Sequence, residues 1–247
     1  MKNKKVLILT GCQDDLKNGY DGSYHELLSL TLKSKIDYAQ KYNYDFLILR
    51  SFKEDKENIL KRKDNYNGFL RILEIFKLLN HYDIVMWLDA DALITNSDIS
   101  IDQFGINEDQ FLYVSWDWMN KNVSYQSISG YTHYFSVGNF IFNKTPLLEN
   151  FIKCFCDNAY YFAEEQMLMN TIYSETEFKK NISILDHSFL NGVPEFVYDY
   201  DEWKDLKNRT DYSIENPWKK NYFLAHICGL NNKNRIKSIK QNFKEFI

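Results

Sequence analysis

The stretch VMWLDADALITN, residues 85–96, runs from apolar residues into two aspartates, Asp89 and Asp91, and then becomes apolar again. A buried carboxylate without a partner is costly, so a buried strand rarely ends on two of them unless a positive charge meets them there. We therefore expect a divalent cation at this point of the fold.

The spacing of the two aspartates suits such a cation. Residues two apart on an extended chain share a face, so both carboxylates can address one ion directly or through water. Mg²⁺ and Mn²⁺ prefer oxygen ligands and commonly bridge carboxylates to phosphates, which points to a nucleotide diphosphate as a partner. The alternative is an acidic pair that caps a helix or stays solvated.

Apolar runs alternate with helical patterns in the first half of the chain. The expected strands are residues 5–11, 44–50 and 82–91, and the expected helices are residues 23–42 and 67–80. Apolar strands separated by helices indicate an α/β fold with a Rossmann-type, mostly parallel central sheet and helices on both faces. Such sheets bind ligands beyond the carboxyl ends of their strands, where Thr10, Gly11 and the two aspartates fall.

The second half has a less regular pattern. Its expected strands are residues 110–118 and 133–144, its expected helices are residues 145–162 and 164–173, and residues 182–192 and 222–229 are expected to be short strands within loops. Residues 199–220 show no clear period and are expected to form a long surface excursion.

Length and composition limit the class of protein. With 247 residues, of which 45% are hydrophobic, the chain can form one large domain, expected over residues 1–230. A net charge of -4 provides no basic field, so we expect no nucleic-acid partner. The first apolar run is too short for a signal peptide or a membrane span, and the cysteines lack zinc-type spacing. These features favour a cytoplasmic protein.

Residues 231–247 form a basic C-terminal tail. Four lysines and Arg235 accompany apolar residues at roughly helical spacing: Ile236, Ile239, Phe243 and Phe246. The pattern predicts an amphipathic helix that can rest on an anionic membrane, at its inner face. The alternative is a helix that docks its apolar side on the body of the protein and leaves its lysines in solvent.

Five segments resemble, in order and approximate spacing, a known glycosyltransferase family. They are KSKIDYAQKYNYDFLIL (33–49), VMWLDADALITN (85–96), SVGNFIFNKT (136–145), AEEQMLMNTIY (163–173) and FLAHICGL (223–230). The set is similar to family 34, which contains galactosyltransferases, mannan-synthesis enzymes and xyloglucan xylosyltransferases. The resemblance implies a GT-A fold, a nucleotide-sugar donor, a manganese ion and a retaining reaction.

The resemblance also implies a set of metal ligands. Asp89 and Asp91 match the family's DxD pair, and His226 matches the histidine of its late HxxG motif, which Gly229 completes. Imidazole suits Mn²⁺, and Mg²⁺ is the second candidate. A lone histidine between apolar residues is otherwise more often a packed core residue.

Two further segments are implied to contact the donor sugar. Gly138 and Asn139 lie in a segment similar to the one that approaches the sugar in the family, and a glycine there permits close backbone approach. Glu164, Glu165 and Gln166 resemble the family's acidic pair followed by glutamine. The resemblance implies catalytic positions beside the sugar for Glu165 and Gln166. The alternative for Glu165 is a helix-favouring acid in the first turn.

Four positions complete the candidate substrate contacts. Thr10 and Gly11 end the first strand, where a GT-A fold normally holds uracil and ribose. Lys35 lies on the first helix, where packing or solvation could equally explain it. Arg71, on the helix before the DxD strand, could clamp a diphosphate.

The leading hypothesis is therefore a metal-dependent retaining glycosyltransferase. It would move a sugar from a UDP-sugar, with UDP-Gal favoured, to a glycan acceptor through an α-linkage. One rival is a sugar nucleotidyltransferase, which should carry a Gly-rich phosphate loop and a basic signature near its first strand. Another is a non-catalytic carbohydrate-binding protein on the same fold, which would not hydrolyse UDP-sugars in the presence of Mn²⁺.

Overall fold

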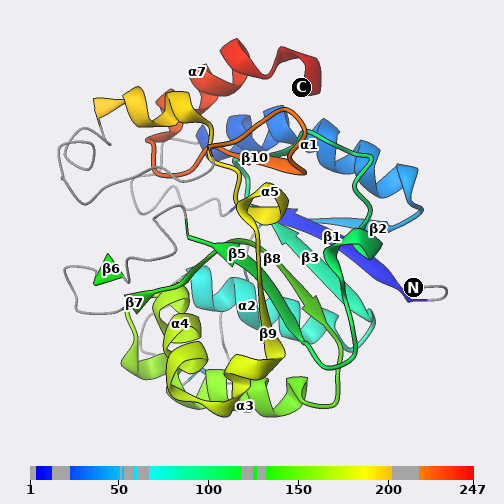
Figure 1. The fold of residues 1–247 in the computed structure, drawn as a ribbon, viewed down its shortest axis with the longest axis vertical. Coiled ribbons are helices and arrows are strands. Elements are labelled where there is room, and N and C mark those ends of the chain that lie inside the picture. The colour runs from blue at the N-terminus through cyan, green and yellow to red at the C-terminus, as the bar shows by residue number, and fades with distance from the viewer. Residues whose placement is uncertain are drawn as a thin grey trace.

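The computed structural model describes residues 4–12, 23–50, 52, 58–60, 67–117, 125–126, 132–201 and 217–247. Its centre is a six-stranded sheet in the order β2-β1-β3-β8-β5-β9 (Figure 1). These strands are β1 (Val6–Gly11), β2 (Asp45–Leu49), β3 (Ile84–Leu88), β5 (Leu112–Trp116), β8 (Phe135–Asn143) and β9 (Ile182–Leu185). Most of the expected surface excursion, residues 202–216, lies outside the described residues.

The central sheet is mostly parallel, as the sequence predicts. β1 pairs in parallel with β2 and β3, and β5 pairs in parallel with β9. β8 is the exception, because it runs antiparallel to both β3 and β5. Between β5 and β8 the described chain holds only the hairpin strands β6 (Tyr125–Gln126) and β7 (Thr132–His133), and antiparallel neighbours need no helical crossover.

Helices cover both faces of the sheet, which confirms the predicted fold class. They are α1 (Ser23–Lys41), α2 (Asn67–Leu78), α3 (Leu148–Asn158) and α4 (Glu165–Glu175). Along β3, Val85 and Trp87 pack in the cluster that includes α2, α3 and α4. Met86 and Leu88 pack in the opposite cluster with Tyr38 of α1. This alternation explains why the β3 sequence is apolar at every position.

A second, two-stranded sheet joins distant parts of the chain. It pairs β4 (Ala92–Ile94) with β10 (Leu224–His226) in antiparallel register, and in Figure 1 β10 lies beyond the central sheet, close to α1. The predicted short strand in residues 222–229 is therefore present, but it pairs with β4 rather than with the main sheet. The short helix α5 (His187–Leu190) lies between the two sheets in the same view.

The C-terminal segment docks on the body of the protein. Helix α7 (Asn232–Asn242) lies along α1 (Figure 1), and Ile239 and Phe243 are buried in a cluster with Leu27 and Leu28. The alternative of a docked apolar side therefore describes this helix. The lysines of α7 remain exposed. The membrane contact stays a prediction.

Short 3-10 helices complete the described elements. They are η2 (Ile101–Phe104), η3 (Ala159–Tyr161), η4 (Glu177–Asn181), η5 (Glu195–Asp199) and η7 (Lys244–Phe246). Among the described residues, no helix is both long enough and apolar enough to cross a bilayer.

Candidate active site

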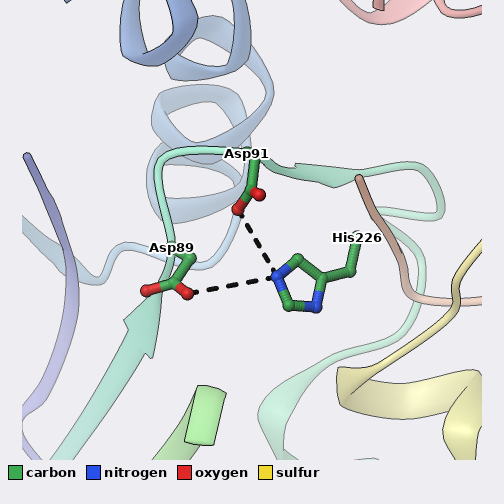
Figure 2. A group of neighbouring side chains, drawn as sticks. All are labelled: Asp89, Asp91 and His226. Carbon is green, nitrogen blue, oxygen red and sulfur yellow. Dashed lines mark ion pairs between the residues drawn. The ribbon is translucent and has the colours of Figure 1, made fainter. Parts of the chain in front are cut away.

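The three predicted metal ligands lie together. Asp89 directly follows β3 and Asp91 directly precedes β4, while the pairing of β4 with β10 sets His226 opposite Ala92. The Nε2 atom of His226 is 3.4 Å from Oδ1 of Asp91 and 4.0 Å from Oδ2 of Asp89 (Figure 2). One ligand atom from each of the three residues lies within 4.8 Å of the others.

An asparagine that the sequence analysis missed orients the imidazole of His226. Nδ1 of His226 is 2.9 Å from Oδ1 of Asn191, whose amide nitrogen donates to the carbonyl of Trp116 at 3.0 Å. The amide oxygen can only accept, so Nδ1 carries the hydrogen in this pair and Nε2 faces the carboxylates. Fixing the ring through its second nitrogen is typical of metal-ligating histidines.

Neighbouring charges and burial shift the pKa values of all three ligands. Burial opposes ionisation of Asp91, but Arg235 and His226 outweigh it and lower its pKa. Burial raises the pKa of Asp89, against the opposing effect of Arg71. Burial alone would lower the pKa of His226, but Cys228 and Asp91 raise it well above its usual value. Two carboxylates and one imidazole form a donor set that fits Mn²⁺ or Mg²⁺.

Two glycines are required by the geometry of the site. A β-carbon on Gly138 would lie 2.6 Å from Cε1 of His226 and 3.0 Å from Oδ2 of Asp89, so any side chain would intrude on the ligand atoms. Gly229 adopts a φ of 72°, in the left-handed region that favours glycine, and forms the turn between β10 and α7. Both residues were candidates from the sequence.

Arg71 joins two carboxylates, the partly buried Asp89 and the buried Glu165. Its Nη1 donates to Oδ1 of Asp89 at 2.8 Å and its Nη2 donates to Oε1 of Glu165 at 2.7 Å. Nε1 of Trp87 donates to the same oxygen of Asp89 at 2.6 Å, and the Arg71 guanidinium lies 5.1 Å from the centroid of the Trp87 ring. In the described structure Arg71 therefore holds Asp89 in place.

Glu165 lies in a narrow space at the start of α2. A β-carbon on Gly68 would overlap the Glu165 carboxylate, so the glycine leaves room for it. Burial raises the pKa of Glu165, although Arg71 opposes this. Glu165 is thus linked to the metal-ligand cluster through Arg71. An acid that only favours the first turn of a helix would not need such a link.

Two of the predicted sugar contacts, Gln166 and Asn139, accept hydrogen bonds from the backbone of the site. The N–H of Val137 donates to Oε1 of Gln166 at 3.0 Å, which brings Gln166 next to Gly138. The N–H of Asp89 donates to Oδ1 of Asn139 at 3.0 Å, and Asn139 is buried. Their direct contact with a sugar stays a prediction.

Lys35 and Thr10 form a buried support beneath Asp89. Nζ of Lys35 donates to the carbonyl of Asp89 at 2.7 Å, to Thr31 at 3.0 Å and to Thr10 at 3.1 Å. Thr10 in turn donates to the carbonyl of Leu88 at 2.7 Å. Both side chains are fully buried, so they can influence a donor through the position of Asp89.

The packing of the sheet requires a glycine at position 11. A β-carbon there would overlap the carbonyl oxygen of Leu49 on the neighbouring strand β2. The predicted contact of Gly11 with the nucleotide is not tested by this packing.

The buried ammonium of Lys35 should make stability depend on pH. Burial lowers the pKa of Lys35 from 10.5 to about 7, although Asp91 and Asp89 oppose this. Between these values the unfolded chain binds the extra proton, so the free energy of unfolding should rise with pH, by at most about 1.4 kcal/mol per unit. Urea unfolding of the wild type and Lys35→Met at about pH 7 and about pH 9 should show the wild type gaining stability relative to the variant. A difference that does not change with pH would contradict this effect.

The model of the galactosyl transferase GMA12/MNN10 family matches residues 2–137, which include β1, α1, Arg71 and the DxD pair. No curated protein matches the chain by sequence. The family match supports transferase activity over the nucleotidyltransferase and the non-catalytic binding protein.

Solved glycosyltransferases share the whole fold. The glycosyltransferase involved in glycosylation of the major capsid of PBCV-1 superposes with a TM-score of 0.60 at 17% identity, over 96% of this chain and 98% of that one. The galactosyltransferase LgtC, crystallised with donor and acceptor sugar analogues, gives 0.51 at 13% identity, over 98% and 100%. The bifunctional enzyme WbbM gives 0.58 at 15% identity, over 97% of this chain and 50% of that one.

These similarities show the GT-A fold, which the sequence predicts. The family match covers more than half of the chain, because it includes residues 2–137 of 247. The chain therefore belongs to the galactosyl transferase GMA12/MNN10 family and is a glycosyltransferase of the GT-A fold.

Proposed function

We propose that the protein is a metal-dependent retaining glycosyltransferase that uses a nucleotide-sugar donor, a UDP-hexose, and a glycan acceptor. The observation that carries the proposal is the convergence of Asp89, Asp91 and the Nε2 atom of His226. A Mn²⁺ or Mg²⁺ ion held by these residues would neutralise negative charge on the departing diphosphate. The favoured donor is UDP-Gal, in line with the galactosyl transferase family.

The surrounding residues would orient the donor and the ligands. Arg71 holds the Asp89 carboxylate, and the absence of a side chain at Gly138 leaves room for the side chains of His226 and Asp89. Gln166, fixed by the N–H of Val137, would position the sugar. An amide is a poor nucleophile, so its proposed role is positioning and stabilisation of positive charge on the sugar ring.

The retaining outcome is best tested on the product. Glu165 is buried and bound to Arg71, which makes it a weak nucleophile and favours a front-face reaction in which the leaving phosphate accepts the acceptor's proton. We expect an α-linkage from a UDP-α-sugar, read from the anomeric proton coupling of the freshly formed bond. A β-linked product would overturn the retaining assignment and the roles of Glu165 and Gln166.

The donor can be identified by ligand-induced stabilisation. UDP-Gal, UDP-Glc, UDP-Xyl, UDP-GlcNAc and GDP-Man are added with Mn²⁺, and thermal unfolding is followed. A ligand at about a hundredfold excess over its Kd stabilises the folded state by about 2.7 kcal/mol, which is readily measured. We expect UDP-Gal to give the largest shift.

We also propose that α7 contacts an anionic membrane at its cytoplasmic face. The support is the set of exposed lysines on this helix and on the short helix η7 that follows it: Lys233, Lys237, Lys240 and Lys244. Lys240 already pairs with Glu26 at 2.6 Å, so the matched test replaces the other three by glutamine. Cosedimentation with anionic vesicles should fall in the triple variant, and equal partitioning would remove the proposal.

A further inference from the structure

Arg235 reaches from the C-terminal helix into the candidate metal site. It lies in the first turn of α7, and its Nη1 is 3.3 Å from Oδ2 of Asp91. Oδ1 of the same carboxylate faces Nε2 of His226 at 3.4 Å. Asp91 therefore offers one oxygen to the imidazole and the other to the guanidinium. In the sequence, Arg235 is distinguished only as one positive charge of the basic tail.

The guanidinium of Arg235 is held in place, but not all of its N–H donors are used in the described structure. The Arg235 side chain is 18% exposed, and its Nε is buried without a hydrogen-bond partner among the residues that the structure describes. Nη1 also makes a long hydrogen bond to Oδ1 of Asn232, at 3.4 Å. Arg235 thus has donor capacity left for a further acceptor close to Asp91.

Helix α7 fixes the position from which Arg235 reaches Asp91. The side chains of Ile239 and Phe243 are buried against α1, and Oγ of Ser238 is 2.6 Å from the hydroxyl of Tyr200. A positive charge is therefore anchored beside the metal ligands by packing that does not involve them.

This arrangement has a consequence for metal affinity. A cation bound by Asp91 would lie close to the guanidinium and would compete with it for the same carboxylate. The repulsion between the two positive charges means that Arg235 must weaken the binding of a divalent ion alone. A diphosphate carries negative charge that attracts both the ion and the guanidinium. Each would then bind more tightly in the presence of the other, since coupling between ligands is reciprocal.

We propose that Arg235 makes metal binding depend on the donor: the site binds the ion weakly alone and tightly together with a nucleoside diphosphate. This inference rests on the proposed function, because it requires the ion to bind at Asp89, Asp91 and His226. It assigns Arg235 a positioning role in the electrostatics of the site.

The test is a Mn²⁺ titration of Arg235→Met, with free Mn²⁺ followed by its electron paramagnetic resonance signal. Without nucleotide, the variant should bind Mn²⁺ about tenfold more tightly than the wild type. Added UDP should tighten Mn²⁺ binding strongly in the wild type and much less in the variant. A purely structural role for Arg235 predicts the opposite sign, because a disturbed site would bind Mn²⁺ more weakly.

Two further variants control the result. Lys237→Met removes the same charge from an exposed position on the same helix and should behave like the wild type. Arg235→Lys keeps the charge and should keep the dependence on UDP. If Arg235→Met does not fold, Arg235→Gln replaces it.

The outcomes separate this inference from the proposed function. If the wild type binds Mn²⁺ with UDP but Arg235→Met has unchanged affinity for Mn²⁺ alone, the inference is overturned and the proposed function stands. If the wild type binds no Mn²⁺ in the presence of UDP, the proposed metal site itself is wrong and both fail.

Discussion

Asp91→Asn is expected to abolish Mn²⁺-dependent donor binding and transfer while the protein stays folded. The amide keeps the shape of the side chain but removes the charge that offsets the cation. Asp91 is buried and lies between His226 and Arg235, so no neighbouring carboxylate in the described site takes its place between them. Loss of several kcal/mol of charge stabilisation corresponds to a fall in kcat/KM of about a thousandfold or more.

The measurement is transfer and UDP-sugar hydrolysis with Mn²⁺ and with EDTA. Asp98→Asn makes the same change at an exposed aspartate that pairs with Lys41, and it should leave activity intact. Full activity of Asp91→Asn in EDTA would be incompatible with a metal at this position. Thermal unfolding of both variants confirms that the comparison is between folded proteins.

Arg71→Met is expected to lower both stability and activity. Arg71 forms ion pairs with the partly buried Asp89 and the buried Glu165. Removing one partner of a buried ion pair typically costs about 3–5 kcal/mol. The DxD pair would also lose the contact that positions Asp89. Urea unfolding gives the stability, and UDP-sugar hydrolysis gives the activity.

Two comparisons make this expectation specific. Lys77→Met removes an exposed ion pair from the same helix and should cost less than about 1 kcal/mol. Adding Glu165→Met to Arg71→Met should restore part of the stability, because one uncompensated buried charge is removed. If Arg71→Met is no less stable than Lys77→Met, the buried network has no such role.

Local pattern was sufficient to predict most of the elements. The apolar run of β3 and the 3.6-residue period of α2 arise from burial on one or both sides of each element. Such a pattern can be read from the sequence of that one segment. The direction of β8 could not be predicted in this way. Its apolar residues face both sides of the sheet whichever way the strand runs, and its neighbours are set by distant connections.

The residues of the candidate site also differ in how far the sequence alone could identify them. Asp89, Asp91 and His226 could be named because their residue types have distinctive chemistry and belong to recognisable motifs. Asn191 and Arg235 could not, because their importance comes from contacts made only after folding. Lys35 was named as a candidate substrate contact, with packing or solvation as the alternatives, and the fold buries it beneath Asp89.

The pairing of β4 with β10 also has a consequence for the order of folding. His226 reaches Asp91 only when a strand near the end of the chain closes a very long loop onto one from its first half. Such contacts carry the largest entropic cost and tend to form late. A growing chain can therefore complete β1, β3, β5 and β8 before it can assemble the three ligands. Capacity to bind the ion would then report that synthesis has passed β10, so an incomplete chain would carry the sheet without its reactive centre.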